Sequence, residues 1–330
     1  MAEVGMRAVI TGAAGFIGSR FSELFLERAE DLGYDDIVLF DALTYSGRRE
    51  NMDQVLRDRR ASFLHGSIVD AEAADRALRG ADAVIHFAAE SHVDRSIAGA
   101  QPFFTTNVLG THQLLESARR GDVRRFVHVS TDEVYGSIEE GSWRENHVLE
   151  PNSPYASSKA GSDLAALAYN RTYGLDVRVT RCSNNYGPRQ FPEKMIPLFV
   201  TNLLDGLRAP LYGDGLNVRD WLHVDDHCRG VLAVLEAGRA GEVYNIGGGT
   251  ELTNQAITDR LLELCGADAS MVESVADRLG HDRRYSVDWT KIKNELGYAP
   301  RVDFDEGLAD TVRWYRDHEE WWRPLKDQVA

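Results

Sequence analysis

The sequence predicts an α/β protein in which a doubly wound parallel sheet is joined to a smaller α/β domain in the C-terminal half. Two observations predict the sheet: short apolar runs alternate with stretches of helical periodicity, and a glycine-rich turn, GxxGxxG, joins the first run to the first helix. A third predicts the second domain, because prolines, glycines, arginines and aromatic residues mix after Asn184. Ligands of such sheets bind beyond the carboxyl ends of the strands.

Seven apolar runs have the length of buried strands. We expect strands within residues 7–11, 36–43, 61–68, 81–90, 124–131, 177–185 and 241–249. Helical spacing is clearest over residues 16–29, 107–120 and 158–174. The last strand is expected to return to the first domain. We therefore predict one domain from residues 1–182 with 222–247, and a second from residues 183–221 with 248–330.

Composition and charge exclude several classes of function. The chain has 330 residues, of which 43% are hydrophobic, enough for a full core. The net charge of −15 argues against general binding to nucleic acids or anionic membranes, because both need a basic surface. We find no signal peptide and no run long enough to span a membrane, and the three cysteines lack disulfide or metal spacing. These features predict a cytoplasmic enzyme or binding protein with reduced thiols.

The glycine turn is typical of a dinucleotide site. Gly12, Gly15 and Gly18 lie between a strand and a helix. There they permit a tight turn, a close approach of the pyrophosphate, and close packing of the helix on the sheet. The amides at the start of the helix donate to the anion.

The end of the second strand indicates which dinucleotide is bound. Asp41 stands there, and an acid at this point accepts hydrogen bonds from an unphosphorylated ribose and repels a 2′-phosphate. Arg48 and Arg49 lie close by, either near the ribose or in a solvated loop. The acid favours NAD over NADP.

A second motif, YxxxK, places Tyr155 and Lys159 on one helix face. A phenol has an ordinary pKa of about 10, too high for a base at neutral pH. A lysine cation and a positive nicotinamide nearby are expected to lower the pKa of Tyr155. The alternative is a surface pair on an amphipathic helix. The upstream cofactor motif and Thr131 on the fifth strand favour a catalytic pair.

The stretch VSTDEVYG, residues 129–136, places Asp132 and Glu133 side by side after an apolar run. Neighbours on a strand point to opposite faces, so both carboxyl groups can serve one site only where the strand ends in a turn. The alternative is that both are solvated turn residues, or that one caps the turn that follows.

Further stretches accompany these motifs in order along nearly the whole chain. They are TGAAGFIGS, FAAESHVDRSI, TNVLGT, SPYASSKAGSD, RCSNNYGPRQFPEKMIP, GDGLNVRDWLHVDDH and GHDRRY. With them the chain resembles the dTDP-glucose 4,6-dehydratases of the extended short-chain dehydrogenase/reductase family. The resemblance implies a Rossmann domain that binds NAD, a smaller domain that binds the nucleotide sugar dTDP-glucose, and a homodimer.

The resemblance also implies a reaction in three steps. Tyr155, supported by Thr131 and Lys159, takes the proton of the sugar 4-hydroxyl while hydride leaves C4 for NAD. The new ketone acidifies C5–H, so Glu133 acts there as base while Asp132 protonates the departing 6-hydroxyl. Hydride then returns to C6. A proton on Asp132 at neutral pH requires a pKa rise of about 3 units, or roughly 4 kcal/mol, which burial and an adjacent carboxylate both favour.

The same resemblance supplies two groups of binding residues. Those expected at the cofactor are Gly12, Gly15, Phe16, Ile17, Gly18, Asp41, Leu43, Thr44, Ser67, Ile68, Phe87, Ala88, Ala89, Ser91, Thr106, Tyr155, Lys159 and Asn185. Those expected at the nucleotide sugar are Ser91, Thr131, Asn184, Glu193, Lys194, Met195, Pro210, Tyr212, Arg219, Asn254, Arg278, His281 and Tyr285. Ser67 departs from the family, which usually has an aspartate there for the adenine amino group. We expect weaker adenine binding unless Asp70 compensates.

Other functions of the same fold remain alternatives. They are another nucleotide-sugar 4,6-dehydratase, an epimerase, or an NAD-sensing regulator without turnover. Epimerases of the superfamily lack the acid pair, and GDP-mannose dehydratases carry a serine at the position of Asp132, so the pair indicates elimination. We expect no metal: His223, Asp225 and Asp226 are near one another, but capping of a helix by one of the two acids is the favoured interpretation.

The expected dimer would use two helices from each subunit, one near residues 105–119 and the other carrying the YxxxK motif. The apolar positions on these helices exceed what one face turned to a sheet requires. They are Val108, Leu114, Leu115, Ala118, Leu164, Leu167 and Ala168. The alternative is that all of them pack in the core.

Overall fold

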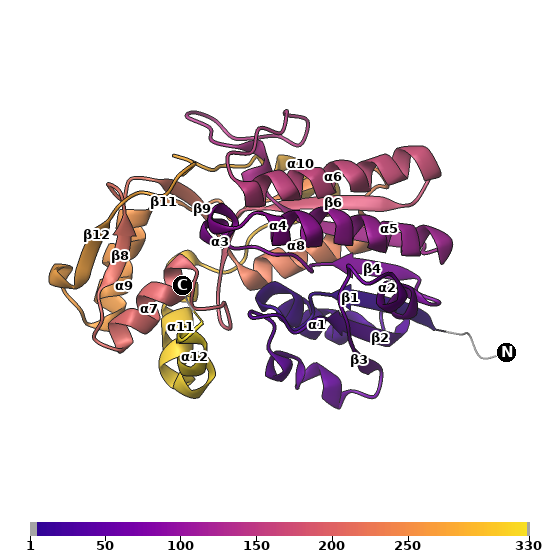
Figure 1. The fold of residues 1–330 in the computed structure, drawn as a ribbon, viewed down its shortest axis with the longest axis horizontal. Helices are drawn as coiled ribbons and strands as arrows, with labels where there is room; N and C mark the ends of the chain where they lie inside the picture. The colour runs from indigo at the N-terminus through magenta and orange to yellow at the C-terminus, as the bar shows by residue number, and fades with distance from the viewer. Residues whose placement is uncertain (1–4, 329–330) are drawn as a thin grey trace.

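The structure, a computed structural model, describes residues 5–328. Its centre is a parallel sheet of seven strands in the order β10-β6-β5-β4-β1-β2-β3 (Figure 1). The strands are β1 (Met6–Thr11), β2 (Tyr34–Asp41), β3 (Ala61–His65), β4 (Ala83–His86), β5 (Arg125–Thr131), β6 (Val177–Cys182) and β10 (Val243–Ile246). Each overlaps one of the predicted runs, so the doubly wound α/β fold is confirmed.

Helices cover both faces of this sheet. One face is covered by α1 (Phe16–Arg28), α8 (Val224–Ala237) and α10 (Thr290–Leu296), and the other by α2 (Ala71–Leu78), α5 (Thr111–Arg120) and α6 (Pro154–Tyr173). Local residues set both ends of α6. Ser153 accepts a hydrogen bond from the amide of Ala156, Pro154 occupies the first turn, and Gly174 ends the helix in the left-handed region at φ 72°.

Short helical turns connect these elements. They are η1 (Arg49–Met52), η2 (Val55–Arg57), α3 (Val93–Ala98), α4 (Gln101–Phe103), η3 (Phe104–Gly110), η4 (Asp132–Tyr135) and η5 (Ala269–Met271). The α-helix predicted from residue 107 begins only at Thr111, because η3 is a π-helix. Such wide turns are common at functional sites. Here the π-helix contains Thr106, one of the residues predicted at the cofactor.

The rest of the chain forms a smaller region beside the carboxyl ends of the large sheet (Figure 1). Its strands are β7 (Asn184–Tyr186), β9 (Val218–His223) and β11 (Glu251–Thr253) in one sheet, and β8 (Ala209–Tyr212) and β12 (Val272–Val275) in a parallel pair. Its helices are α7 (Met195–Leu204), α9 (Asn254–Cys265), α11 (Phe304–Asp317) and α12 (Glu319–Lys326). We keep the division into two domains as a proposal, with one refinement: α10 packs on the large sheet through Ile292.

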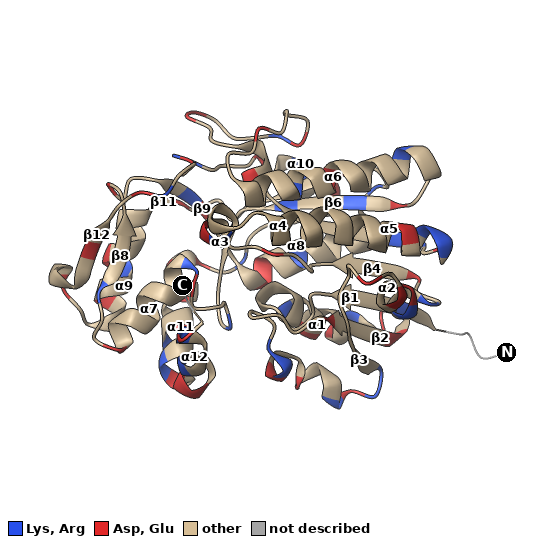
Figure 2. Cartoon of the chain, in the orientation of Figure 1, with Lys and Arg blue, Asp and Glu red and all other residues tan. Residues whose placement is uncertain are grey.

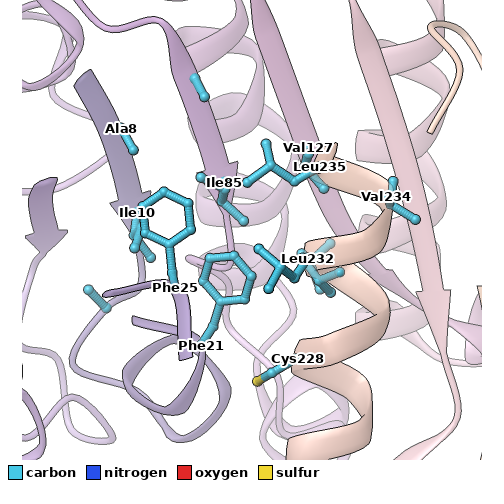
Figure 3. Packing of buried hydrophobic residues seen from close by; sticks show 14 of the residues in the cluster. Ala8, Ile10, Phe21, Phe25, Ile85, Val127, Cys228, Leu232, Val234 and Leu235 are labelled. Atoms are coloured by element: carbon cyan, nitrogen blue, oxygen red, sulfur yellow. The ribbon is translucent and has the colours of Figure 1, made fainter. Parts of the chain in front are cut away.

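Charged side chains lie mainly on the outer helices and loops, with both signs mixed (Figure 2). Below them, Phe21 and Phe25 of α1 and Leu232 and Leu235 of α8 pack against Ile85 and its neighbours on the sheet (Figure 3). Two cysteines are buried and Cys265 is half-buried, and all three are free thiols. No helix within residues 5–328 is long and apolar enough to cross a membrane.

The apolar positions expected at a dimer interface divide into two sets. Leu114, Leu115, Ala118 and Leu167 are buried in the core between the helices and the sheet, so their assignment to an interface was wrong. They face the sheet because α5 and α6 lie flat on it. Leu164 is 59% exposed. Ala168 is also exposed and Val108 is half-buried.

Candidate active site

The carboxyl ends of the large sheet border two adjoining cavities. The first, of about 310 Å³, is lined by the glycine turn, the ends of β2 and β5, and the start of α6. The second, of about 160 Å³, is lined mainly by the smaller region. Six residues line both cavities and mark their junction: Glu133, Asn184, Asn185, Gln190, Glu193 and Lys194.

The predicted site residues gather around these cavities with one exception. The predicted catalytic residues, and the predicted cofactor residues other than Leu43, line the first cavity. The predicted substrate residues line the second cavity, apart from Ser91 and Thr131, which line the first. Leu43 lies behind the wall, and its amide donates to Asp41 Oδ1 over 2.7 Å. It therefore shapes the loop after β2 instead of forming the cavity wall.

The glycine turn makes room for an anion because it lacks side chains. Gly12 has φ +68°, and a Cβ there would lie 2.6 Å from the amide nitrogen of Ala88. A Cβ on Gly18 would lie 2.1 Å from the carbonyl oxygen of Gly12. Gly15 precedes α1, and within the described chain no side chain caps the first amides of this helix. The turn therefore fits the pyrophosphate of a dinucleotide.

The carboxylate of Asp41 is fixed at the edge of the same cavity. Its Oδ2 accepts from the amide of Ala14 over 2.9 Å, and burial raises the pKa of this carboxyl. Arg48 and Arg49 form ion pairs with acidic neighbours in the loop. Their charges are therefore engaged away from Asp41, and the site fits an unphosphorylated ribose better than a 2′-phosphate.

Helix α6 brings Tyr155 and Lys159 to the end of β5. The Nζ of Lys159 donates to the carbonyl of Val129 over 2.9 Å, and burial lowers the pKa of the lysine to about 8. Burial raises the pKa of Tyr155 well above its ordinary value, and Glu133 acts in the same direction. A hydrogen bond with Thr131 lowers the pKa of the phenol. The lowering that we expect from Lys159 together with a bound nicotinamide stays a prediction.

The chain turns directly after β5, as two adjacent carboxyl groups in one site require. Thr131 is extended, and its side chain accepts from the amide of Glu133 at the start of η4. Asp132 is 2% exposed, and its Oδ2 has no hydrogen-bond partner among residues 5–328. Burial first, and then the charge of Glu133, raise the pKa of Asp132 well above its ordinary value. Thr131 Oγ1 donates to the other oxygen, Oδ1, over 3.4 Å, so burial with one oxygen unpaired favours the protonated form of this carboxyl.

Glu133 is held in a different environment from its neighbour. Burial raises the pKa of Glu133, but the cations Arg278, Lys194 and Arg219 act against that rise. The turn therefore places a carboxyl whose environment favours the protonated form beside one that three cations help to ionise. Neighbouring groups with such different environments suit an acid and a base in one reaction.

Two arginines and two amides converge on the second cavity. Arg219 is 4% exposed, donates to the carbonyls of Val218 and Asp282, and lies over the ring of Tyr285 at 4.4 Å. The Nε of Arg278 and the Oδ1 atoms of Asn184 and Asn254 are buried without partners in the described part of the chain. The free Nε–H of Arg278 can donate to an anionic ligand, and the two amide oxygens can accept from its hydroxyl or N–H groups.

Comparisons with known proteins agree with this geometry. A family model described as GDP-mannose 4,6 dehydratase matches residues 9–311. A curated dTDP-glucose 4,6-dehydratase from Streptomyces antibioticus is 60% identical over 328 residues, which cover 98% of this chain and 97% of that protein. The chain belongs to the dTDP-glucose 4,6-dehydratase family.

Solved structures support the same assignment. The dTDP-glucose 4,6-dehydratase DesIV from Streptomyces venezuelae, solved with NAD and TYD bound, is 63% identical and has a TM-score of 0.95 over 97% of this chain and all of that chain. A UDP-glucose 4-epimerase from Thermus thermophilus, solved with NAD, is 31% identical with a TM-score of 0.86 over 95% of this chain and all of that chain.

The departure from this family at position 67 lies in the wall of the first cavity. Ser67 Oγ accepts from the amide of Val69 over 3.2 Å. Asp70 caps α2, where its carboxylate accepts from the amides of Glu72 and Ala73. The carboxylate that we considered as a compensating acceptor for adenine is therefore engaged with the helix.

Sequence reasoning missed several residues of the two cavities. Glu90 and Cys182 line the first, Asp94 and Trp221 line the second, and Gln190 lines both. All five lie within the stretches that carry the family motifs, so inspecting each motif residue by residue was the available signal. The structure adds that the Nε1 of Trp221 is buried without a partner within the described chain.

The stretch WLHVDDH also differs from its expected role. His223, not an aspartate, caps α8 by accepting from the amide of Asp225. Asp225 pairs with Arg20 of α1, and Asp226 accepts from the amide of Arg301. Both acids therefore serve long-range contacts that sequence spacing does not reveal.

Proposed function

We propose that this chain is a dTDP-glucose 4,6-dehydratase that holds NAD in the first cavity and the nucleotide sugar in the second. The observation that carries the proposal is the meeting of Tyr155 and Lys159 with Thr131, Asp132 and Glu133 in the wall of the first cavity, where Glu133 also borders the second. The dehydratases of Streptomyces at about 60% identity support it.

The glycine turn would hold the NAD pyrophosphate, and Asp41 would accept from the adenosine ribose. When bound, NAD supplies a hydride acceptor at C4 of the hexose and returns the hydride to C6. Asp41 is already fixed by two backbone amides, so it meets the ribose without reorganising.

Tyr155 and the turn η4 handle the protons of the reaction. The oxygen of Tyr155 takes the proton of the 4-hydroxyl, and Thr131 stabilises the phenolate. Glu133 takes the proton from C5, which the new ketone at C4 has acidified. Asp132 gives its proton to the oxygen leaving C6, so one water forms and a double bond joins C5 and C6. Glu133 then returns its proton to C5 as hydride reaches C6.

In the second cavity, Arg219 and Arg278 would bind the diphosphate, with Lys194, Asn184 and Asn254 as further donors. The unpaired Nε–H of Arg278 and the position of all five side chains in the wall of this cavity support this role. The aromatic rings of Tyr212 and Tyr285 stand near the pyrimidine end of such a ligand and are proposed to contact the base or its ribose.

Mass spectrometry of the product tests the proposal. Purified protein incubated with dTDP-glucose should give a nucleotide sugar that is lighter by one water and carries a ketone. An epimerase would leave the mass unchanged, and a regulator without turnover would give no product.

We also propose that the protein is a cytoplasmic homodimer. Of the expected interface positions, Leu164 is exposed, and the structure adds three that were not predicted, Phe104, Leu109 and Tyr173; the four side chains are between 42% and 59% exposed. Large apolar side chains gathered on neighbouring helices support a protein interface. Cell fractionation tests the location.

A further inference from the structure

The two parts of the proposed catalytic set lie on different elements. Tyr155 and Lys159 are on α6, whereas Asp132 and Glu133 are on η4. Hydride removal uses the first pair and water loss the second. The rate of water loss relative to hydride removal therefore depends on how firmly η4 is held in position relative to α6.

Arg181 on β6 bridges these two elements inside the molecule. It is 3% exposed, and basic residues on β6 are visible in the middle of the fold (Figure 2). Its Nε donates to Oδ2 of Asp163 over 2.8 Å, and Asp163 lies one turn after Lys159 on α6. Its Nη1 donates to the hydroxyl of Tyr135 over 2.8 Å, and Tyr135 is the last residue of η4. The guanidinium also lies 4.8 Å from the centre of the Tyr135 ring.

Both ends of this bridge are fixed further. The hydroxyl of Tyr135 donates to Oδ1 of Asn245 on β10 over 2.8 Å. At the other end, His128 Nε2 on β5 lies 3.3 Å from Asp163 Oδ1 and 3.1 Å from the Oγ of Ser162. Tyr135, Asn245, His128 and Asp163 are all 0% exposed. The network therefore joins five elements around a point beneath the catalytic groups.

A buried ion pair contributes little net stability, because desolvation offsets most of the attraction, but it can fix one arrangement of the chain. We propose that Arg181, with Asp163 and Tyr135, is a positioning residue that holds the turn carrying Asp132 and Glu133 in register with α6. The inference rests on the proposed function, because it assigns the two steps to the two elements.

The test uses a variant that removes one contact of the bridge and keeps the packing. Tyr135→Phe loses only the hydroxyl. A single turnover with dTDP-glucose is quenched at short times, and the 4-keto hexose and the 4-keto-6-deoxy product are counted by mass spectrometry after borodeuteride reduction. We expect water loss to slow about 10-fold, within the roughly 100-fold that a 1 Å misplacement can cause. We expect oxidation at C4 to stay within about twofold and KM to be unchanged, because Tyr155 and Lys159 on α6 and the two arginines of the second cavity do not lie on η4.

Two further variants separate positioning from stability. Arg181→Lys keeps the positive charge, but an ammonium group cannot bind Asp163 and Tyr135 at once as the guanidinium does. Like Tyr135→Phe, this variant should slow water loss more than oxidation at C4, and so lower the ratio of the two rates. Tyr244→Phe is the matched control, because Tyr244 is also 0% exposed and its hydroxyl contacts Glu295 and the amide of Arg239. It should leave the ratio unchanged. If Arg181→Lys does not fold, Tyr135→Phe decides alone.

The bridge is refuted if Tyr135→Phe leaves both rates unchanged or slows both by the same factor, as a purely structural role would do. It is equally refuted if Tyr244→Phe shifts the ratio as Tyr135→Phe does. If the unaltered protein forms no 4-keto species, the proposed function fails and this inference falls with it. If the unaltered protein turns over normally and Tyr135→Phe leaves the ratio of water loss to C4 oxidation unchanged, only the positioning role of Arg181 is refuted, and the proposed function stands.

Discussion

Replacing Asp132 by asparagine separates the acid of the elimination from every other group. The amide has nearly the same shape, but it has no proton to give to the oxygen leaving C6. Oxidation at C4 does not need this proton. We therefore expect Asp132→Asn to form the 4-keto hexose at close to the normal rate and to accumulate it.

The burial of Asp132 determines how strongly Asp132→Asn should affect the rate of water loss and the stability of the protein. Asp132 is 2% exposed, and burial raises its pKa well above the ordinary value. Loss of a positioned general acid costs about 10²- to 10⁴-fold in rate, or roughly 3 to 5 kcal/mol in the barrier. A pKa raised by burial opposes folding at pH 7, where the same carboxyl would be ionised in the unfolded chain. An amide is neutral without that cost, so the variant should unfold at the same or a higher temperature.

Rapid-quench mass spectrometry measures both steps, and thermal unfolding measures stability. Asp163→Asn is a control for stability alone, because Asp163 is equally buried but Arg181 and His128 lower its pKa to about 2; its rates are not compared, since Asp163 belongs to the Arg181 bridge. That variant should lose stability, since it leaves a buried cation unpaired. Unchanged water loss in Asp132→Asn would refute the reasoning, as would an equal loss of C4 oxidation.

Four further predictions test other parts of the site. Tyr155→Phe should abolish both steps, and any accumulation of 4-keto hexose would show another base. Protein purified without added cofactor should release NAD on denaturation; consistent recovery of NADP would overturn the role of Asp41. Burial lowers the pKa of Lys159 to about 8, so the lysine loses its charge as pH rises through about 8, and kcat should fall there; a rate that is constant to pH 10 contradicts this. Light scattering on dilute protein should give a dimer, and Leu164→Glu should weaken it; an active monomer refutes the interface.

The sheet could be predicted because its strands are buried on both faces and therefore read as continuous apolar runs. The glycine turn and YxxxK were equally visible, since each needs a fixed local spacing. The π-helix before Thr111 was not, because its hydrogen-bond shift leaves no mark in the pattern of apolar residues. The burial of Leu114 and Leu115 was misjudged for a similar reason: an apolar helix position does not say whether a sheet or another subunit covers it.

The electrostatics of the site depend on contacts between distant residues, and these explain the remaining errors. The ammonium of Lys159 donates to the carbonyl of Val129 on β5, and Asp225 pairs with Arg20 of α1 instead of capping α8. The bridge through Arg181 joins positions that are far apart in sequence. Periodicity and motif spacing report on neighbours along the chain, so such pairs emerge only from the fold.

The central claim is that one active site removes hydride from C4, eliminates water, and returns the same hydride to C6. dTDP-glucose carrying deuterium at C4 tests it most directly, with the product analysed by mass spectrometry and NMR. We predict that the deuterium appears at C6 of the same molecule, and that a mixture of labelled and unlabelled substrate gives no crossover. In deuterated water, C5 should acquire one solvent deuteron. Deuterium retained at C4, lost to solvent, or transferred between molecules would contradict the account.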